Sequence, residues 1–157
     1  MVSIEATNLT SRKVDLKEIK KNSREIINRL KAVKKFPFLK NSEISVVFVG
    51  PGKIRELNKK YRKKDKPTDI LSFTLERNKS KLIGEIILCP AVIKTKDYGI
   101  SNWITPSPPQ PLLNKEGKGV VNRLLAHGIL HLCGFDHKTE KEWRKMEKIA
   151  GKINPDF

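Results

Sequence analysis

The sequence predicts a single domain of the α+β class, in which short strands and longer helices share one chain. With 157 residues, the chain is long enough for one domain with its own apolar core. Dense β-branched runs with the period of strands occur beside stretches with the period of helices. No internal repeat divides the sequence. One domain spanning residues 1–157 is therefore expected.

Four short stretches have the composition or the alternation of β-strands. The first alternates loosely and is expected to be an edge strand, whereas the run ISVVFV is expected to be a buried strand. The last two stretches flank the turn-like residues 78–81, which predicts a hairpin. The predicted strands are residues 2–9, 44–49, 70–75 and 82–88.

Helical periodicity predicts about five helices. The first and the last carry one apolar stripe between charged residues, which is typical of surface helices. In the last helix, Thr139 is the predicted N-cap. The predicted helices are residues 14–35, 51–61, 91–98, 120–133 and 140–153. The predicted buried stripe of the last one is Trp143, Met146, Ile149 and Ala150.

A proline-rich stretch separates the predicted strands from the fourth predicted helix. Four prolines lie between Pro106 and Pro111, and they exclude a helix at that place. We therefore predict an exposed loop or insertion at about residues 104–119.

All three histidines of the protein lie within LLAHGILHLCGFDH. His127 and His131 are four residues apart, so on a helix they share one face about 6 Å apart along the axis. Gly134 can adopt the left-handed conformation that ends a helix, which lets the chain turn back and offer His137. Three imidazoles with an open fourth position are typical of a catalytic zinc site. One Zn²⁺ ion is the expected cofactor, although imidazole also suits Ni²⁺, Cu²⁺ and Fe²⁺.

The spacing of the histidines is also that of the metzincin proteases, with one difference. Gly128 stands where those enzymes carry the glutamate that takes a proton from the attacking water. Glu85 or Asp136 would have to replace that glutamate, and neither has the right spacing. The pattern therefore predicts metal binding without predicting peptide hydrolysis.

The formal net charge of +16 predicts a polyanionic partner, most often nucleic acid. Six of the eight residues 59–66 are basic, and they directly precede a predicted strand, where a loop could contact phosphates. A solvated charged run is the alternative. Few exposed-looking aromatic residues interleave with these lysines, so this pattern does not predict stacking of bases on aromatic rings. The predicted RNA-contacting residues are Lys59, Lys60, Lys63, Lys64 and Lys66.

Hydropathy and cysteine content predict a cytoplasmic protein without a membrane partner. No apolar run approaches the roughly 18 residues of a membrane span, and no signal peptide is evident. Cys89 and Cys133 do not form a CxxC pair, which favours a reducing compartment. Cys133 follows His131 by two residues, about 200° around a helix, and should point away from the metal.

Three blocks of the sequence resemble the YbeY family of zinc-dependent bacterial endoribonucleases. In chain order the blocks are YRKKDKPTDILSF, IGEIILCP and AHGILHLCGFDH, and this order and their approximate spacing match that family. The glycine after the first histidine distinguishes the family from zinc proteases. The resemblance implies a mixed, mostly four-stranded sheet surrounded by helices, with the metal site on a helix near the C-terminus. One departure is the proline-rich stretch, since family members usually approach the metal helix through a helical segment.

The resemblance also implies a function and roles for individual residues. His127, His131 and His137 would bind zinc, and Arg62 matches the functional arginine of the family. The implied activity is hydrolysis of single-stranded RNA in ribosomal RNA maturation, especially of the small subunit, and in ribosome quality control. Ribosomal RNA and ribosomal subunits are therefore the expected partners.

The expected chemistry leaves some roles open. Arg62 would stabilise negative charge on the reacting phosphate. Asp136 would either orient an imidazole or cap a turn. The nucleophile is either a zinc hydroxide or the RNA 2′-hydroxyl. Two other functions remain alternatives: a metalloprotease that lacks the usual glutamate, and a non-enzymatic ribosome assembly factor with a structural zinc.

Overall fold

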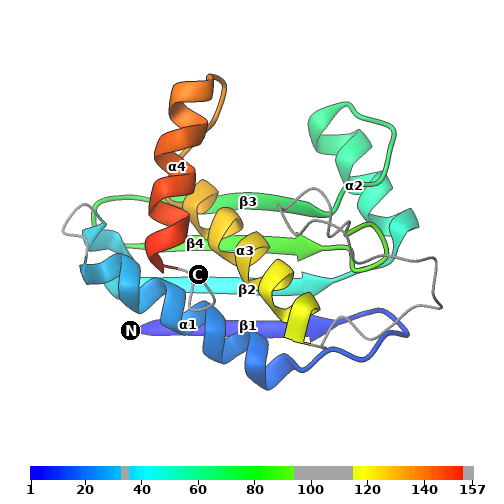
Figure 1. Ribbon diagram of the computed structural model, residues 1–157, viewed down its shortest axis with the longest axis horizontal. Helices are drawn as coiled ribbons and strands as arrows, with labels where there is room; N and C mark the ends of the chain where they lie inside the picture. Colours follow the sequence, from blue (N-terminus) through cyan, green and yellow to red (C-terminus); the bar gives the residue numbers. More distant parts are fainter. Residues whose placement is uncertain (33–35, 94–114, 154–157) are drawn as a thin grey trace.

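The computed structural model describes residues 1–32, 36–93 and 115–153, and it contains a four-stranded mixed sheet with the strand order β1-β2-β4-β3 (Figure 1). The strands are β1 (Val2–Asn8), β2 (Ser42–Phe48), β3 (Ile70–Arg77) and β4 (Leu82–Leu88). β1, β2 and β4 are parallel, whereas β3 pairs with β4 in an antiparallel hairpin. The expected mixed sheet, the edge position of the first strand and the hairpin are confirmed.

The described part of the chain contains four α-helices, one fewer than predicted. They are α1 (Leu16–Ala32), α2 (Pro51–Arg62), α3 (Lys115–Leu132) and α4 (Glu140–Ile153), with a short 3-10 helix η1 (Pro37–Asn41). The third predicted helix, residues 91–98, is not helical at its start. The N–H of Val92 donates a hydrogen bond of 3.0 Å to Cys89, which closes a turn around Pro90 instead. Residues 94–98 lie outside the described residues.

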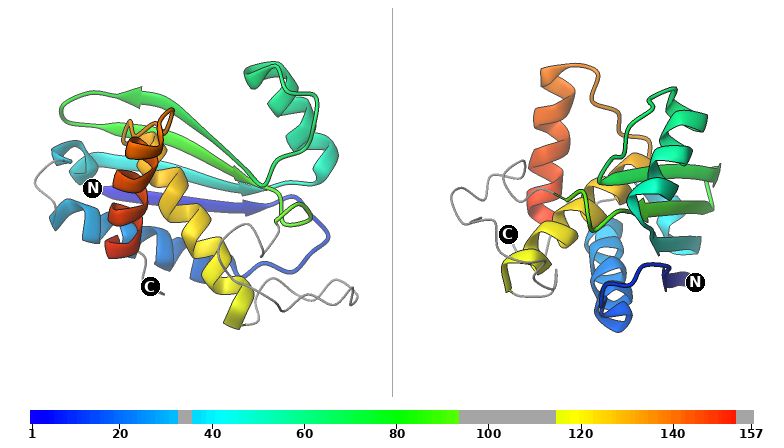
Figure 2. Two further views of the ribbon diagram at one scale, coloured as in Figure 1. Left: turned by 45° about the horizontal axis from the view of Figure 1, so that its top comes forward. Right: turned by 90° about the vertical axis from the view of Figure 1, so that its right-hand side faces the viewer.

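The helices cover the two faces of the sheet unequally (Figure 2). α1, α3 and α4 lie together on one face, where the main apolar core includes the alternate β2 residues Ile44, Val46 and Phe48. A smaller core under α2 holds Ile54 and the strand residue Leu71 on the opposite face. This alternation follows from the pleat of the strands, which sends successive side chains to opposite faces.

α3 begins earlier than the sequence predicted. Residues 115–119, expected in the proline-rich loop, form the start of this helix. No proline follows Pro111 before them, so nothing interrupts the backbone hydrogen bonds of a helix there. Residues 104–114 of the predicted insertion lie outside the described residues.

α4 begins at the predicted N-cap but buries a different set of side chains. Thr139 and Glu142 form a capping box, because the Glu142 N–H donates to the Thr139 hydroxyl (3.3 Å) and the Thr139 N–H to the Glu142 carboxylate (3.1 Å). Met146 and Ala150 are buried as predicted. Trp143, also predicted to be buried, is 42% exposed, because it lies beyond the end of the core at the histidine cluster.

Within the described residues, no helix combines the length and the apolar character needed to cross a membrane.

Candidate metal centre

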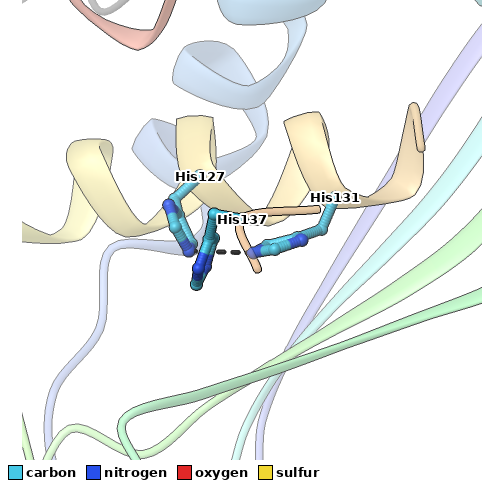
Figure 3. A group of neighbouring side chains, drawn as sticks. All are labelled: His127, His131 and His137. Carbon is cyan, nitrogen blue, oxygen red and sulfur yellow. Dashed lines mark hydrogen bonds between the residues drawn. The ribbon is translucent and has the colours of Figure 1, made fainter. Parts of the chain in front are cut away.

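The three histidines converge on one point beside α3 (Figure 3). His127 and His131 project from successive turns of the helix, and their Nε2 atoms lie 2.9 Å apart. His137 reaches the same point from the chain that follows the helix. The candidate ligand nitrogens of all three lie within 4.8 Å of one another. The predicted grouping of the histidines is therefore present.

The turn after α3 brings His137 back toward the helix. Gly134 has a φ of 95°, the left-handed conformation that the sequence predicted. The N–H of Gly134 donates to His131 (2.8 Å) and that of Phe135 donates to Leu130 (3.1 Å), the two bonds of a Schellman motif. The Phe135 ring packs against Phe36, 5.7 Å between centroids, which anchors the turn to the core.

The same turn sets the tautomer of His131. The Nδ1 atom of His131 lies 2.8 Å from the Phe135 carbonyl oxygen. A carbonyl oxygen only accepts hydrogen bonds, so Nδ1 must carry the proton. In the neutral ring the lone pair is then on Nε2, the atom that faces His127. A carbonyl that orients a metal-binding imidazole through its second nitrogen is common in metal sites.

Burial keeps the cluster in the form that binds metals. Burial, followed by the charges of His131 and His137, lowers the pKa of His127 to about 4. Burial also lowers the pKa of His131. Both rings are therefore neutral at neutral pH, as coordination requires.

The donor set fits a divalent ion that prefers nitrogen ligands. Two imidazoles that bind zinc at about 2.0–2.1 Å with tetrahedral angles have nitrogens about 3.4 Å apart. The observed separations, from 2.9 Å to at most 4.8 Å, bracket that value. Three ligands leave a fourth position for water or substrate, as in catalytic zinc sites.

Arg62, the last residue of α2, lies within electrostatic range of the cluster. Its charge contributes to the lowered pKa of both His127 and His131. Arg62 is exposed and forms no ion pair with the residues that the structure describes. By contrast, Arg55 and Lys59 of the same helix both pair with Asp65, at 2.8 and 3.0 Å. Among the described residues, Arg62 is thus a cation without an ion pair that lies within electrostatic range of the histidines.

Asp69 is a carboxylate near the site that sequence reasoning missed. Its charge opposes the lowering of the pKa of His127. Its side chain accepts a hydrogen bond of 3.2 Å from the Thr68 hydroxyl, and its carbonyl accepts one of 2.9 Å from the Cys89 N–H. The available signal was its position seven residues after Arg62 in the same block, immediately before β3.

The predicted RNA-contacting lysines lie at the end of α2 and in the loop after it, and all are exposed. Asn58 holds this loop against the helix through a hydrogen bond of 2.7 Å to the Lys66 carbonyl. Lys63 has a φ of 60° and ends the helix. Lys59 is engaged by Asp65, and Lys60 lies 5.2 Å from the centroid of the Tyr61 ring. The loop therefore presents several ammonium groups in one ordered turn.

The remaining predicted site residues lie as follows. The Asp136 carboxylate accepts a hydrogen bond of 2.9 Å from the His137 N–H and lies 3.6 Å from Lys138. This bond caps the turn, while the Asp136 charge partly opposes the lowering of the His131 pKa by burial.

Glu85 lies on the sheet face opposite α3, since its neighbour Ile86 packs into the main core. Cys133 is buried in that core, and burial raises the pKa of its thiol to about 12.

Comparisons with known proteins agree with this geometry. The family model described as Endoribonuclease YbeY matches residues 5–156. Endoribonuclease YbeY of Thermodesulfovibrio yellowstonii is 37% identical, and the alignment covers 87% of this chain and 89% of the relative. The protein of that name from Aquifex aeolicus is 38% identical, with coverage of 71% and 70%.

A solved structure shows the same fold. The solution structure of TM1509 from Thermotoga maritima aligns with a TM-score of 0.50 and 23% sequence identity. The alignment covers 98% of this chain and 94% of that protein. With a histidine cluster on a mixed α+β fold and a family model that matches almost the whole chain, the protein belongs to the YbeY family of endoribonucleases.

Proposed function

We propose that the protein is a zinc-dependent endoribonuclease that hydrolyses phosphodiester bonds of single-stranded RNA during maturation of small-subunit ribosomal RNA. The observation that carries this proposal is the convergence of His127, His131 and His137 on one point, with the charge of Arg62 within electrostatic range. Family membership supports the RNA substrate, because the relatives are named endoribonucleases.

Side chains of this protein would position the metal ion and the RNA. His127, His131 and His137 would hold the ion, with His131 oriented by the Phe135 carbonyl. A bound Zn²⁺ would supply Lewis acidity for the scissile phosphate and for the nucleophile. Arg62 would bind the phosphate oxygens through its planar guanidinium and stabilise the negative charge that develops on them. The exposed lysines of residues 59–66 would bind neighbouring phosphates irrespective of sequence.

The setting follows from charge and chemistry. A net charge of +16 suits ribosomal RNA and ribosomal subunits as partners. Two buried, unpaired cysteines suit the reducing cytoplasm. We extend the proposal to a role in ribosome quality control.

The function is tested on protein purified without chelator and without added metal. Metal analysis should find about one zinc per chain, since the three histidines form one site. Single-stranded RNA should be cleaved, chelation should abolish cleavage, and zinc should restore it. A panel of peptides should stay intact. Cleavage of peptides but not RNA, or cleavage of RNA unaffected by chelation, would refute the proposal.

A further inference from the structure

Trp143 is an exposed aromatic residue beside the histidine cluster. It lies in the first turn of α4, where its backbone N–H donates a hydrogen bond of 3.0 Å to the Thr139 carbonyl. Its ring centroid is 5.0 Å from that of His137 with the planes at 87°, and 5.8 Å from that of His127. With 42% of the residue exposed, the indole touches the candidate metal ligands and still faces solvent.

Packing in the apolar core does not explain the position of this tryptophan. Helical spacing places Trp143 at the start of the stripe that continues through Met146, Ala150 and Ile153. Those three residues are buried in the main core, whereas Trp143 extends past its end. The exposed part of the indole adds little to folding, since that apolar surface stays in water. Such a residue at the rim of a site is suited to contact a ligand.

The charged neighbours of Trp143 are engaged with other groups. Glu142 accepts hydrogen bonds of 3.1 Å from the backbone N–H groups of Lys138 and Thr139. Glu140 forms an ion pair with Arg144 on the same helix. Neither acid is therefore an unpaired charge that would repel a phosphate chain beside the indole.

We propose that Trp143 is the platform on which the RNA base adjacent to the scissile phosphate stacks. This inference rests on the proposed function and specifies how the substrate is positioned. A base and its phosphate are joined by one sugar, so a base on Trp143 belongs to a nucleotide at the histidines, 5.0 Å away. Any base can stack on an indole, so the contact is tolerant of sequence. It also favours single strands, whose bases have free faces, over duplexes.

The first test compares Trp143→Phe with Trp143→Leu, which retains apolar bulk but lacks a π face. Stacking of one base on an aromatic side chain typically strengthens binding about fivefold to a hundredfold. We expect Trp143→Leu to lower kcat/KM for RNA about tenfold, with zinc content and melting temperature unchanged, while Trp143→Phe retains most activity. An abasic nucleotide next to the scissile phosphate should slow the parent protein about tenfold and leave the rate of Trp143→Leu unchanged.

The second test follows the indole directly. The sequence has two tryptophans, so Trp103→Phe leaves Trp143 as the sole indole emitter. A 2′-O-methyl oligonucleotide, which resists cleavage through its 2′-oxygen, should quench this emission on binding, and its abasic counterpart should quench it much less. Equal rates for Trp143→Leu and Trp143→Phe, or binding without quenching, would overturn the stacking role. Quenching without RNA cleavage by the parent protein would instead overturn the proposed function alone.

Discussion

A Cβ atom on Gly128 would lie only 3.0 Å from the Cδ1 atom of Ile86, because α3 packs directly on the sheet at this residue. It would also lie 3.2 Å from the Ser72 hydroxyl. Gly128 occupies the position of the general-base glutamate in zinc proteases of the same histidine spacing. Tight packing at this position therefore argues against the protease alternative.

Gly128→Glu should destabilise the protein without creating a peptidase. Overpacking typically costs about 1–3 kcal/mol, and a buried carboxylate adds to that cost. Gly119→Glu is the matched control, because it lies in the same helix and a Cβ there meets nothing within 4 Å. Urea unfolding and a peptide cleavage assay measure both effects. A stable Gly128→Glu protein that cleaves peptides would contradict this reading.

Gly134→Ala should weaken both folding and zinc binding. The left-handed φ of 95° costs a residue with a Cβ about 1–2 kcal/mol, and that atom would crowd the Arg77 guanidinium. Because the turn places His137, zinc affinity should fall together with stability.

A double variant separates the two causes in Gly134→Ala. Arg77→Ala in the Gly134→Ala background removes the crowding but leaves the backbone strain, so it should recover only part of the loss in unfolding free energy. Arg77 also donates a hydrogen bond of 3.3 Å to the Leu132 carbonyl, so Arg77→Ala alone is the necessary control. If the double variant recovered the whole loss in unfolding free energy, the left-handed backbone conformation of residue 134 would not contribute to the destabilisation.

The metal-free protein should lose stability as the pH falls from 6.5 toward 4. The pKa of His127 is about 4 when folded, against 6.5 for the free side chain, so the unfolded chain binds the proton first. The His127 contribution levels off below pH 4 and amounts to about 3 kcal/mol, and the lowered pKa of His131 adds to the loss in the same direction. Denaturant unfolding at several pH values with a chelator present measures it. His127→Asn should flatten this dependence, and an unchanged slope would contradict it.

Arg62→Ala should strongly slow RNA cleavage while leaving the melting temperature unchanged. The side chain is exposed and has no ion pair with described residues, so folding does not depend on it. Removing one such charge-stabilising group typically costs about a hundredfold to a thousandfold in rate. Single-turnover cleavage and thermal unfolding measure the two effects. If Arg62→Ala left both folding and the cellular role intact while His131→Ala destabilised the fold, the non-enzymatic assembly factor with structural zinc would be favoured instead.

The lysine loop should determine the salt dependence of RNA binding. Replacing Lys60, Lys64 and Lys66 with alanine should reduce the slope of log affinity against log salt by about 2, at about 0.7 per phosphate for single strands. The control replaces Lys17 and Lys21 of α1 and Lys40 of η1, which are exposed and give the same change in net charge outside α2 and its loop. Figure 1 shows α1 well apart from α2. An equal reduction in both triple variants would mean that only net charge matters.

Much of the fold was predictable because its signals are local. The strand runs and the hairpin follow from alternation and turn residues. The spacing of His127 and His131 and the glycine after them predicted that the three histidines converge. One helical turn brings the first two together, and one left-handed residue returns the chain with the third. The Thr139 N-cap is likewise read from four consecutive residues.

Tertiary structure decided what depends on distant segments. Only folding brings Arg62 and Asp69 within electrostatic range of His127, roughly sixty residues further along the chain. The periodicity of α4 predicted a buried Trp143, but the end of the core, which no local pattern records, leaves it exposed at the metal site. The sequence thus determined the candidate metal ligands, while the packing of α2 and α4 with the rest of the fold determined which other groups lie near them.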